Sequence, residues 1–310
     1  MPQHPYIAAT MERLAKLPAI AWSTPLAVRA SFSTGTALLG PKAQMSSALD
    51  VKIPTRDGQI TARLLIPNSE PVGLVIYVHG GGWVIGGVED FDTLGRRLAE
   101  VSGCAVLIPA YRLAPEHPFP AALYDVMDTV LAISNGALPQ IPGKSLVLSG
   151  DSAGANLATV TARKLSEDHQ IVAQVLFYPL TNCEFETDSY LRHGTGLPLT
   201  KAQMLWFFGH YAPRELWPNP DITPLNANDL HKLPRSVIVT AEYDVLAYEG
   251  RHYAEKLIRE GVETTYVEAK GLAHGFLRQH NLLKPADDIL MHVGDTIQQI
   301  YASQSGFATK

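Results

Sequence analysis

The chain has 310 residues, of which 46% are hydrophobic, and its formal net charge is −5. This length and apolar content suit one large domain with a sizeable core, and an acidic chain is a poor candidate for nucleic-acid binding, which needs a basic surface. Its two cysteines, Cys104 and Cys183, are too few and too far apart for a disulfide framework or a cysteine-metal site.

Residues 1–45 contain helical patterns at 7–17 and 25–39, broken by prolines, and we interpret them as an N-terminal cap segment. Basic residues at 13 and 16 precede an apolar run, a faint signal-peptide pattern. Prolines interrupt that run, so we favour a cytoplasmic location over export. The uncharged stretch 73–88 is too short and too glycine-rich to cross a bilayer, so no membrane span is predicted.

Two strands, 49–54 and 60–66, are predicted on either side of a turn at Arg56-Asp57-Gly58. From residue 73 the sequence alternates between strand and helix patterns. The predicted strands are 73–78, 104–109, 145–149, 172–177, 236–241 and 263–268, and the predicted helices are 91–102, 119–134, 153–167, 248–260 and 285–302. Such alternation indicates an α/β fold with a mainly parallel sheet and helices on both faces.

A glycine run, His79-Gly80-Gly81-Gly82-Trp83, follows the strand predicted at 73–78. Consecutive glycines allow backbone N–H groups to turn toward a developing oxyanion. A flexible loop and a phosphate cradle are the alternatives, but a phosphate loop requires a Gly-Lys-Ser/Thr ending, which is absent here.

The serine Ser152 lies in Gly150-Asp151-Ser152-Ala153-Gly154, between the strand predicted at 145–149 and the helix predicted at 153–167. This strand, tight turn and helix place a serine hydroxyl at the edge of a sheet, where it can act as a nucleophile. The N–H of Ala153, at the helix start, is a second oxyanion donor. The pentapeptide alone is a weak signal, because glycine and serine are common turn residues.

A serine nucleophile needs a base and an acid that orients it, in the chain order Ser, Asp or Glu, His. Asp244 follows the strand 236–241, and His274 lies in a loop, 271–276, after the strand 263–268. Glu242 is the rival acid, and we favour Asp244 because a helix pattern begins soon after it. Separately, Asp244 is also explained as a helix N-cap and His274 as a hydrogen-bonding loop residue.

The alternation stops between residues 183 and 231, where aromatic residues occur among prolines and polar residues. One interpretation is a cap insertion that lines a substrate pocket, and the other is an amphipathic helix that only covers the core. Residues 46–182 and 232–310 would then form the catalytic domain. The predicted pocket residues, from the cap and from the catalytic domain, are Trp83, Tyr178, Leu197, Trp206, Phe207, Tyr211 and Phe276.

With these motifs, the chain resembles the hormone-sensitive-lipase-like esterases of the alpha/beta-hydrolase superfamily, in the Gly-Asp-Ser-Ala-Gly branch. The resemblance covers about residues 79–276, including Tyr111-Arg112-Leu113-Ala114-Pro115-Glu116 and His274-Gly275-Phe276. It implies hydrolysis of short-chain acyl esters, a helical cap over the site, and a homodimer formed through an edge strand and the last helix. The implied oxyanion donors are Gly81, Gly82 and Ala153, and the implied supporting residues are His79, Gly80 and Asp151.

We therefore predict a serine carboxylesterase that acts on a small ester through Ser152, His274 and Asp244. No metal or cofactor is expected, because the remaining histidines are not spaced as a ligand set. The same residues could hydrolyse an amide or a lactone, because the cap rather than the triad contacts the leaving group. A small-molecule-binding protein on this fold is the alternative from another class, but such proteins typically lack the catalytic histidine.

Overall fold

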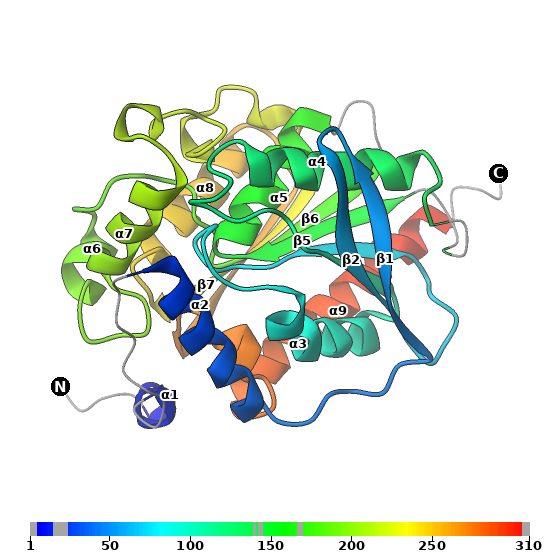
Figure 1. Ribbon diagram of the computed structural model, residues 1–310, viewed down its shortest axis with the longest axis horizontal. Coiled ribbons are helices and arrows are strands. Elements are labelled where there is room, and N and C mark those ends of the chain that lie inside the picture. Colours follow the sequence, from blue (N-terminus) through cyan, green and yellow to red (C-terminus); the bar gives the residue numbers. More distant parts are fainter. Residues whose placement is uncertain (1–4, 15–23, 139–140, 142–144, 166–169, 306–310) are drawn as a thin grey trace.

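The computed structural model describes residues 5–14, 24–138, 141, 145–165 and 170–305, and within them eight strands form one sheet (Figure 1). The strands are β1 (Ser47–Thr55), β2 (Gly58–Ile66), β3 (Leu74–Val78), β4 (Ala105–Pro109), β5 (Leu146–Asp151), β6 (Ile171–Phe177), β7 (Arg235–Tyr243) and β8 (Thr264–Ala273). Their order across the sheet is β1-β2-β4-β3-β5-β6-β7-β8. The pairs β1–β2 and β2–β4 are antiparallel, and the others are parallel.

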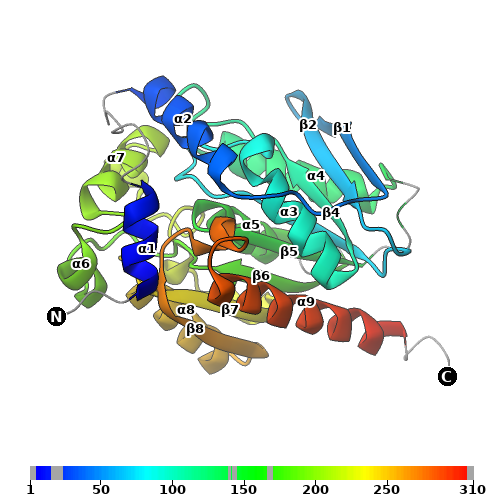
Figure 2. The same ribbon diagram turned by 90° about the horizontal axis from the view of Figure 1, so that it is seen from below.

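Helices cover both faces of this sheet, as Figures 1 and 2 show. The α-helices are α1 (Pro5–Leu14), α2 (Pro25–Thr34), α3 (Val88–Ser102), α4 (Ala121–Ser134), α5 (Ala153–Leu165), α6 (Asp188–His193), α7 (Lys201–Tyr211), α8 (Ala247–Arg259) and α9 (Lys284–Ser305). The 3-10 helices are η1 (Gly35–Leu38), η2 (Arg214–Leu216), η3 (Pro224–Asn226), η4 (Leu230–Lys232) and η5 (Phe276–Gln279). The predicted α/β class is confirmed.

The central strands are buried on both faces, which explains their continuous apolar sequence. All five residues of β3 are buried, and they alternate between two cores. Ile76 and Val78 pack in the core beneath α4, α5 and α8, whereas Val75 and Tyr77 pack in the core beneath α3 and α9. The strand therefore stabilises both layers at once.

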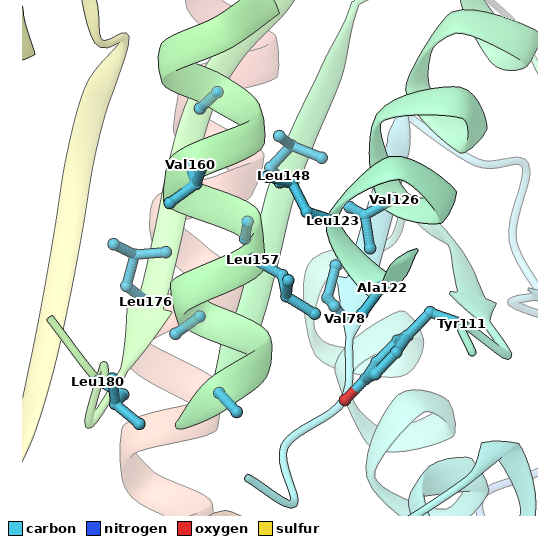
Figure 3. Packing of buried hydrophobic residues seen from close by; sticks show 14 of the residues in the cluster. Val78, Tyr111, Ala122, Leu123, Val126, Leu148, Leu157, Val160, Leu176 and Leu180 are labelled. Atoms are coloured by element: carbon cyan, nitrogen blue, oxygen red, sulfur yellow. The ribbon is translucent and has the colours of Figure 1, made fainter. Parts of the chain in front are cut away.

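Helix α5, which follows Ser152, lies close against the sheet because its buried positions include several alanines. Its larger side chains, Leu157 and Val160, pack beside Leu148 of β5 and Leu176 of β6 (Figure 3). This packing fixes the helix start, and with it the position of the preceding serine.

The strand order reverses between β3 and β5. After β3 the chain adds β4 on one side, and it later returns to place β5 on the other. In open α/β sheets the crevice at the carboxyl ends of two such strands is the usual binding position. The glycine run at 79–83 and Ser152 leave the sheet at this point.

The predicted strands and helices are present, with differences at their ends. Strand β7 continues to Tyr243 and β8 to Ala273, so the first half of the loop predicted at 271–276, residues 271–273, belongs to the strand. The extension has a local cause, because the Glu242 carboxylate accepts a hydrogen bond from the Gly271 N–H, 2.7 Å away. The predicted helix ends at 15–17 and 166–167, like Lys16 of the signal pattern, lie outside the described residues.

In the described part of the chain, no helix combines the length and hydropathy that a membrane crossing requires.

Candidate active site

Ser152 lies at a sharp turn between β5 and α5. Its φ of 55° is in the left-handed region, which is unusual for a residue with a side chain. The flanking glycines are required by space: a Cβ on Gly154 would lie 2.0 Å from the Val78 carbonyl oxygen, and one on Gly150 would lie 2.6 Å from it. The turn is therefore pressed against the end of β3, and its strain is typical of a functional position.

His274 and Asp244 meet the serine at the ends of their strands. The distance from His274 Nε2 to Ser152 Oγ is 3.0 Å, and that from His274 Nδ1 to Asp244 Oδ2 is 2.7 Å. Asp244 is buried, and its other oxygen accepts a hydrogen bond from the Leu246 N–H at 3.0 Å. The three side chains, which are far apart along the chain, thus form one continuous line of contacts.

Glu242, the rival acid, occupies a different place. Its Oε2 accepts a hydrogen bond from the Gly271 N–H, whereas it is Asp244 whose carboxylate contacts the His274 ring. Glu242 ties β7 to β8 just before His274, so it supports the strand that carries the histidine.

The glycine run lies beside Ser152, and Gly81 and Gly82 line the same cavity as the serine. Both adopt positive φ, 122° and 58°. A Cβ on Gly82 would lie 2.2 Å from the Phe207 ring, and one on Gly81 would lie 2.2 Å from the Ile85 carbonyl oxygen. No side chain fits at either position, so bare backbone lines the cavity there.

The buried carboxylate of Asp151 holds the glycine run in place through hydrogen bonds. Its Oδ1 accepts hydrogen bonds from the Gly80 N–H and the Tyr77 hydroxyl, both at 2.8 Å. Burial raises the pKa of Asp151 above its ordinary value. The carboxyl group, adjacent to Ser152, therefore couples the position of the glycine run to that of the serine.

His79 also belongs to the support of this loop. Its ring stacks on Tyr111, with 4.3 Å between ring centroids, and its Nδ1 lies 2.8 Å from the Gly80 carbonyl oxygen. Burial lowers the pKa of His79 to about 4. The ring is therefore neutral near pH 7 and is not placed to exchange protons with a substrate at Ser152.

A cavity of about 570 Å³ opens above Ser152 and His274. Its walls come from three parts of the chain: the N-terminal helices, the segment between β6 and β7, and the loops at the carboxyl ends of β3, β5 and β8. Most of its lining is apolar. The apolar side chains in its walls are Phe32, Leu38, Leu39, Ile85, Phe91, Leu180, Leu197, Pro198, Leu199, Met204, Phe207 and Leu282.

The predicted pocket residues divide into two groups. Leu197 and Phe207 line the cavity. Trp83, Tyr178, Trp206, Tyr211 and Phe276 are not among the lining residues of this cavity, so a role for them in the substrate pocket stays a prediction.

The reason is that these aromatic residues pack on one another. Trp83 and Tyr211 are buried and stack with 4.0 Å between centroids. Phe276 is buried edge-on against Tyr178, which lies behind the His274 ring at 4.7 Å. Trp206 packs against His210 on the partly exposed side of α7.

The N-terminal helices supply wall residues that the sequence did not identify individually. One side of the cavity is formed by Phe32 of α2, by Leu38 at the end of η1 and by Leu39, which follows η1. Only the apolar pattern at 25–39 pointed to them, and that pattern alone does not separate a pocket wall from a core-facing helix.

Glu249 of α8 is a further residue that sequence analysis missed. It is buried, and its Oε1 accepts from the N–H groups of Thr181 and Asn182 at 2.6 and 2.9 Å. Those residues follow Leu180, which lines the cavity. Glu249 therefore links the helix after Asp244 to the wall beside Ser152. A single buried glutamate in a helical pattern gave no signal for this role.

We expect the pH dependence of stability to report on Glu249, because burial raises its pKa to about 8. Between the ordinary glutamate pKa and pH 8, the folded chain holds a proton that the unfolded chain has released, so the free energy of unfolding decreases as pH rises. Glu249→Gln removes this decrease in the free energy of unfolding, because the glutamine side chain does not titrate. The Tm of Glu249→Gln relative to wild type should therefore rise from pH 5 to pH 9 in thermal unfolding scans.

Glu255→Gln is the matched control, since that glutamate is about half exposed on the same helix. Its Tm should follow the wild-type curve at every pH. Parallel curves for Glu249→Gln and wild type would contradict the raised pKa.

Among the described residues, no group of three or more His, Cys, Asp or Glu side chains is arranged to hold a metal ion. Cys104 is buried directly before β4, and Cys183 is partly buried; both thiols are free. Burial raises the pKa of Cys104 to about 12, which leaves this thiol unreactive.

Comparison with known proteins gives a consistent set of similarities. The family model described as alpha/beta hydrolase fold matches residues 75–278. The chain is 31% identical to an ethyl acetate hydrolase of Pseudomonas putida over 283 residues, 87% of this chain and 89% of the relative. It is 33% identical to an arylesterase of Saccharolobus solfataricus over 247 residues, 76% of this chain and 79% of the relative.

Among solved structures, the fold is similar to that of a hyperthermophilic esterase from the archaeon Pyrobaculum calidifontis, with a TM-score of 0.90 and 33% identity. The match covers 97% of this chain and 99% of that one. The similarity therefore extends over the N-terminal helices and the segment between β6 and β7, as well as the sheet.

Proposed function

Because the chain belongs to the alpha/beta-hydrolase family, among its hormone-sensitive-lipase-like esterases, we propose how this carboxylic-ester hydrolase works and which esters it accepts. The observation that carries the proposal is the line of contacts from Ser152 Oγ to His274 Nε2, at 3.0 Å, and from His274 Nδ1 to Asp244, at 2.7 Å. Ser152 is the nucleophile, His274 the general base and Asp244 the orienting acid.

The reaction has two steps. Ser152 Oγ attacks the ester carbonyl carbon as His274 Nε2 takes the hydroxyl proton, and the bond to the alcohol oxygen breaks as His274 returns that proton to the leaving alcohol. Water then attacks the acyl carbon as His274 Nε2 takes a proton from it. The bond from that carbon to Ser152 Oγ breaks as His274 returns the proton to Oγ, and the acid leaves. Asp244 stabilises the imidazolium formed in each step.

Negative charge develops on the carbonyl oxygen in both steps. We assign its stabilisation to the N–H groups of Gly81, Gly82 and Ala153. Two observations support this: the side-chain-free backbone at Gly81 and Gly82 lines the cavity beside Ser152, and Ala153 begins helix α5. Loss of one such donor in other enzymes costs roughly 10²–10³ in rate.

Residues 1–45 and 183–231 act as two cap segments over a catalytic domain formed by 46–182 and 232–310. The shared cavity wall supports this division, since Phe32 of α2 and Phe207 of α7 both line it. A mostly apolar cavity of about 570 Å³ fits a short acyl chain and a small alcohol. The name of the Pseudomonas putida relative, an ethyl acetate hydrolase, agrees with a short-chain substrate.

The test is hydrolysis of p-nitrophenyl esters from acetate to dodecanoate. We expect kcat/KM to be highest for short chains and to fall steeply for the longest. Activity only on long chains would refute the short-chain assignment. No activity on any ester would refute the esterase assignment, and an amide panel would then follow.

Phe207 is expected to limit the acyl chain, because its ring lines the cavity against Gly82. Phe207→Leu should raise kcat/KM for octanoate relative to butyrate about tenfold, in line with the roughly 10–200-fold effect of single methylenes in apolar pockets. Phe208→Leu is the control, since Phe208 is buried and lies outside the cavity wall. Equal ratios in the two variants would contradict this role.

A further inference from the structure

Two positively charged side chains lie in the otherwise mostly apolar wall of the cavity above Ser152. Arg278 and Arg13 both line it. Among the described lining residues the one carboxylate is Asp151, which accepts hydrogen bonds from Tyr77 and Gly80 beneath the glycine run. The described wall therefore has more positive than negative charge. The binding of a neutral short-chain ester does not require this excess positive charge.

Arg278 is fixed by aromatic and backbone contacts. It lies in η5, four residues after His274, and its Cζ is 4.0 Å from the centroid of the Phe32 ring and 5.1 Å from that of Phe91. Its Nε donates to the Asp90 carbonyl oxygen, and its Nη2 donates to Thr36 Oγ1, both at 3.1 Å. These contacts hold the guanidinium against two rings that also line the cavity.

No carboxylate in the described chain lies within ion-pair distance of the Arg278 guanidinium. Burial lowers the pKa of Arg278, and the more distant carboxylates of Asp90 and Asp151 only partly oppose that effect. A mostly buried cation without an ion-pair partner is costly to keep. An anionic group that entered the cavity would supply the missing partner.

Arg13 brings a second cation to the same side. Its Nη2 donates to Gln279 Oε1 at 2.9 Å, and Gln279 is the neighbour of Arg278 and also lines the cavity. Helix α1, which carries Arg13, lies beside the end of β8 and η5 in Figure 2. The N-terminal helix thus adds a residue of the same charge as Arg278 to the cavity wall.

From this arrangement we propose that the preferred substrates are esters with a carboxylate at the end of the acyl or the alcohol arm, and that Arg278, assisted by Arg13, binds that carboxylate. This inference rests on the proposed esterase function and narrows its substrate class. Arg278 is then a specificity residue: it contacts the substrate and takes no part in bond breaking. Charge-assisted hydrogen bonds of this kind contribute roughly 1.5–3 kcal/mol, which corresponds to about a 10- to 100-fold effect on kcat/KM.

The experiment compares matched esters by pH-stat at pH 7.5. One series has the charge on the acyl arm, as monoethyl esters of C4 to C8 dicarboxylic acids, and the other has it on the alcohol arm, as O-acetylated ω-hydroxyalkanoates. Each is paired with the ester of equal length that ends in a neutral carboxamide. We expect the wild type to prefer the carboxylate at least tenfold at the best length in one series.

Variants then assign the preference to Arg278. Arg278→Met should lower kcat/KM about 10- to 100-fold for the carboxylate ester and less than threefold for the carboxamide, whereas Arg278→Lys should retain part of the preference. Arg251→Met is the control for net charge, because Arg251 is largely exposed on α8, and it should leave the preference unchanged.

The outcomes separate this inference from the esterase function. A wild type that hydrolyses the neutral esters but prefers no carboxylate at any length would overturn the inference alone. Equal losses on both members of a pair in Arg278→Met and Arg278→Lys would also overturn it, since the arginine would then only anchor η5. No hydrolysis of any ester, charged or neutral, would overturn the proposed function together with the inference.

Discussion

Replacement of Ser152 by alanine is expected to abolish ester hydrolysis, with a decrease in kcat of about 10⁴- to 10⁶-fold, the range found when a triad serine is removed. The hydroxyl oxygen is the atom that attacks the carbonyl, and among the described residues it is the side-chain group in hydrogen-bond contact with His274 Nε2, at 3.0 Å. KM should change little, because the cavity walls remain. Steady-state hydrolysis of p-nitrophenyl butyrate by purified protein measures both constants.

Ser149→Ala is the matched control for this substitution. Ser149 is also a buried serine of β5, and its hydroxyl donates to the Val175 carbonyl oxygen at 3.0 Å. Its removal should lower the free energy of unfolding by about 1 kcal/mol and leave kcat within about threefold of wild type. Retention of more than 1% of wild-type kcat by folded Ser152→Ala would exclude Ser152 as the nucleophile.

The order of strands and helices could be predicted from the sequence because the central strands are short, apolar and buried on both faces. The run from residue 73 to 78 is an example, and its glycine-rich sequel marks the loop beside the serine. The glycines at 150 and 154 were equally informative, since the close contact with β3 excludes any side chain there. At these positions the turn in the sequence and the packing against β3 both require glycine.

The walls of the cavity could not be predicted in the same way. An aromatic residue in an apolar pattern packs against whichever surface the tertiary fold brings to it. Trp83 and Tyr211, far apart in the sequence, stack on each other, whereas Phe207 faces the cavity from the same helix as Tyr211. Periodicity gives the apolar side of a helix, but it does not show where that side ends in a core and where it faces a substrate.

Strand alternation alone could not separate Glu242 from Asp244, for a related reason, and only the helix pattern that follows favoured Asp244. Both residues lie on the same side of an extended segment, because alternation along a strand has a period of two. Strand β7 ends at Tyr243, and the register between β7 and β8 shifts between Ala241 and Tyr243. That irregularity separates the two carboxylates, and no feature of the sequence indicates it.

Asp244→Asn should lower kcat about 10³- to 10⁴-fold with little effect on KM, whereas Glu242→Gln should stay within about tenfold of wild type. The reason lies in the second oxygen of Asp244, which accepts from the Leu246 N–H at 3.0 Å. In the Asp244→Asn variant the amide carbonyl oxygen is held by that N–H, so the amide NH₂ group faces His274 Nδ1. An NH₂ donor there needs an unprotonated Nδ1, which places the imidazole proton on Nε2, and the ring can no longer accept the Ser152 proton.

Glu242→Gln keeps a carbonyl oxygen for the Gly271 N–H and leaves the tautomer of His274 unchanged. The two variants each replace one carboxylate oxygen by NH₂, two residues apart on the same segment, so they are matched in size and in charge removed. Steady-state kinetics with thermal unfolding on both proteins separates the roles. A larger loss of kcat in Glu242→Gln than in Asp244→Asn, with both proteins folded, would exchange the roles assigned to the two acids.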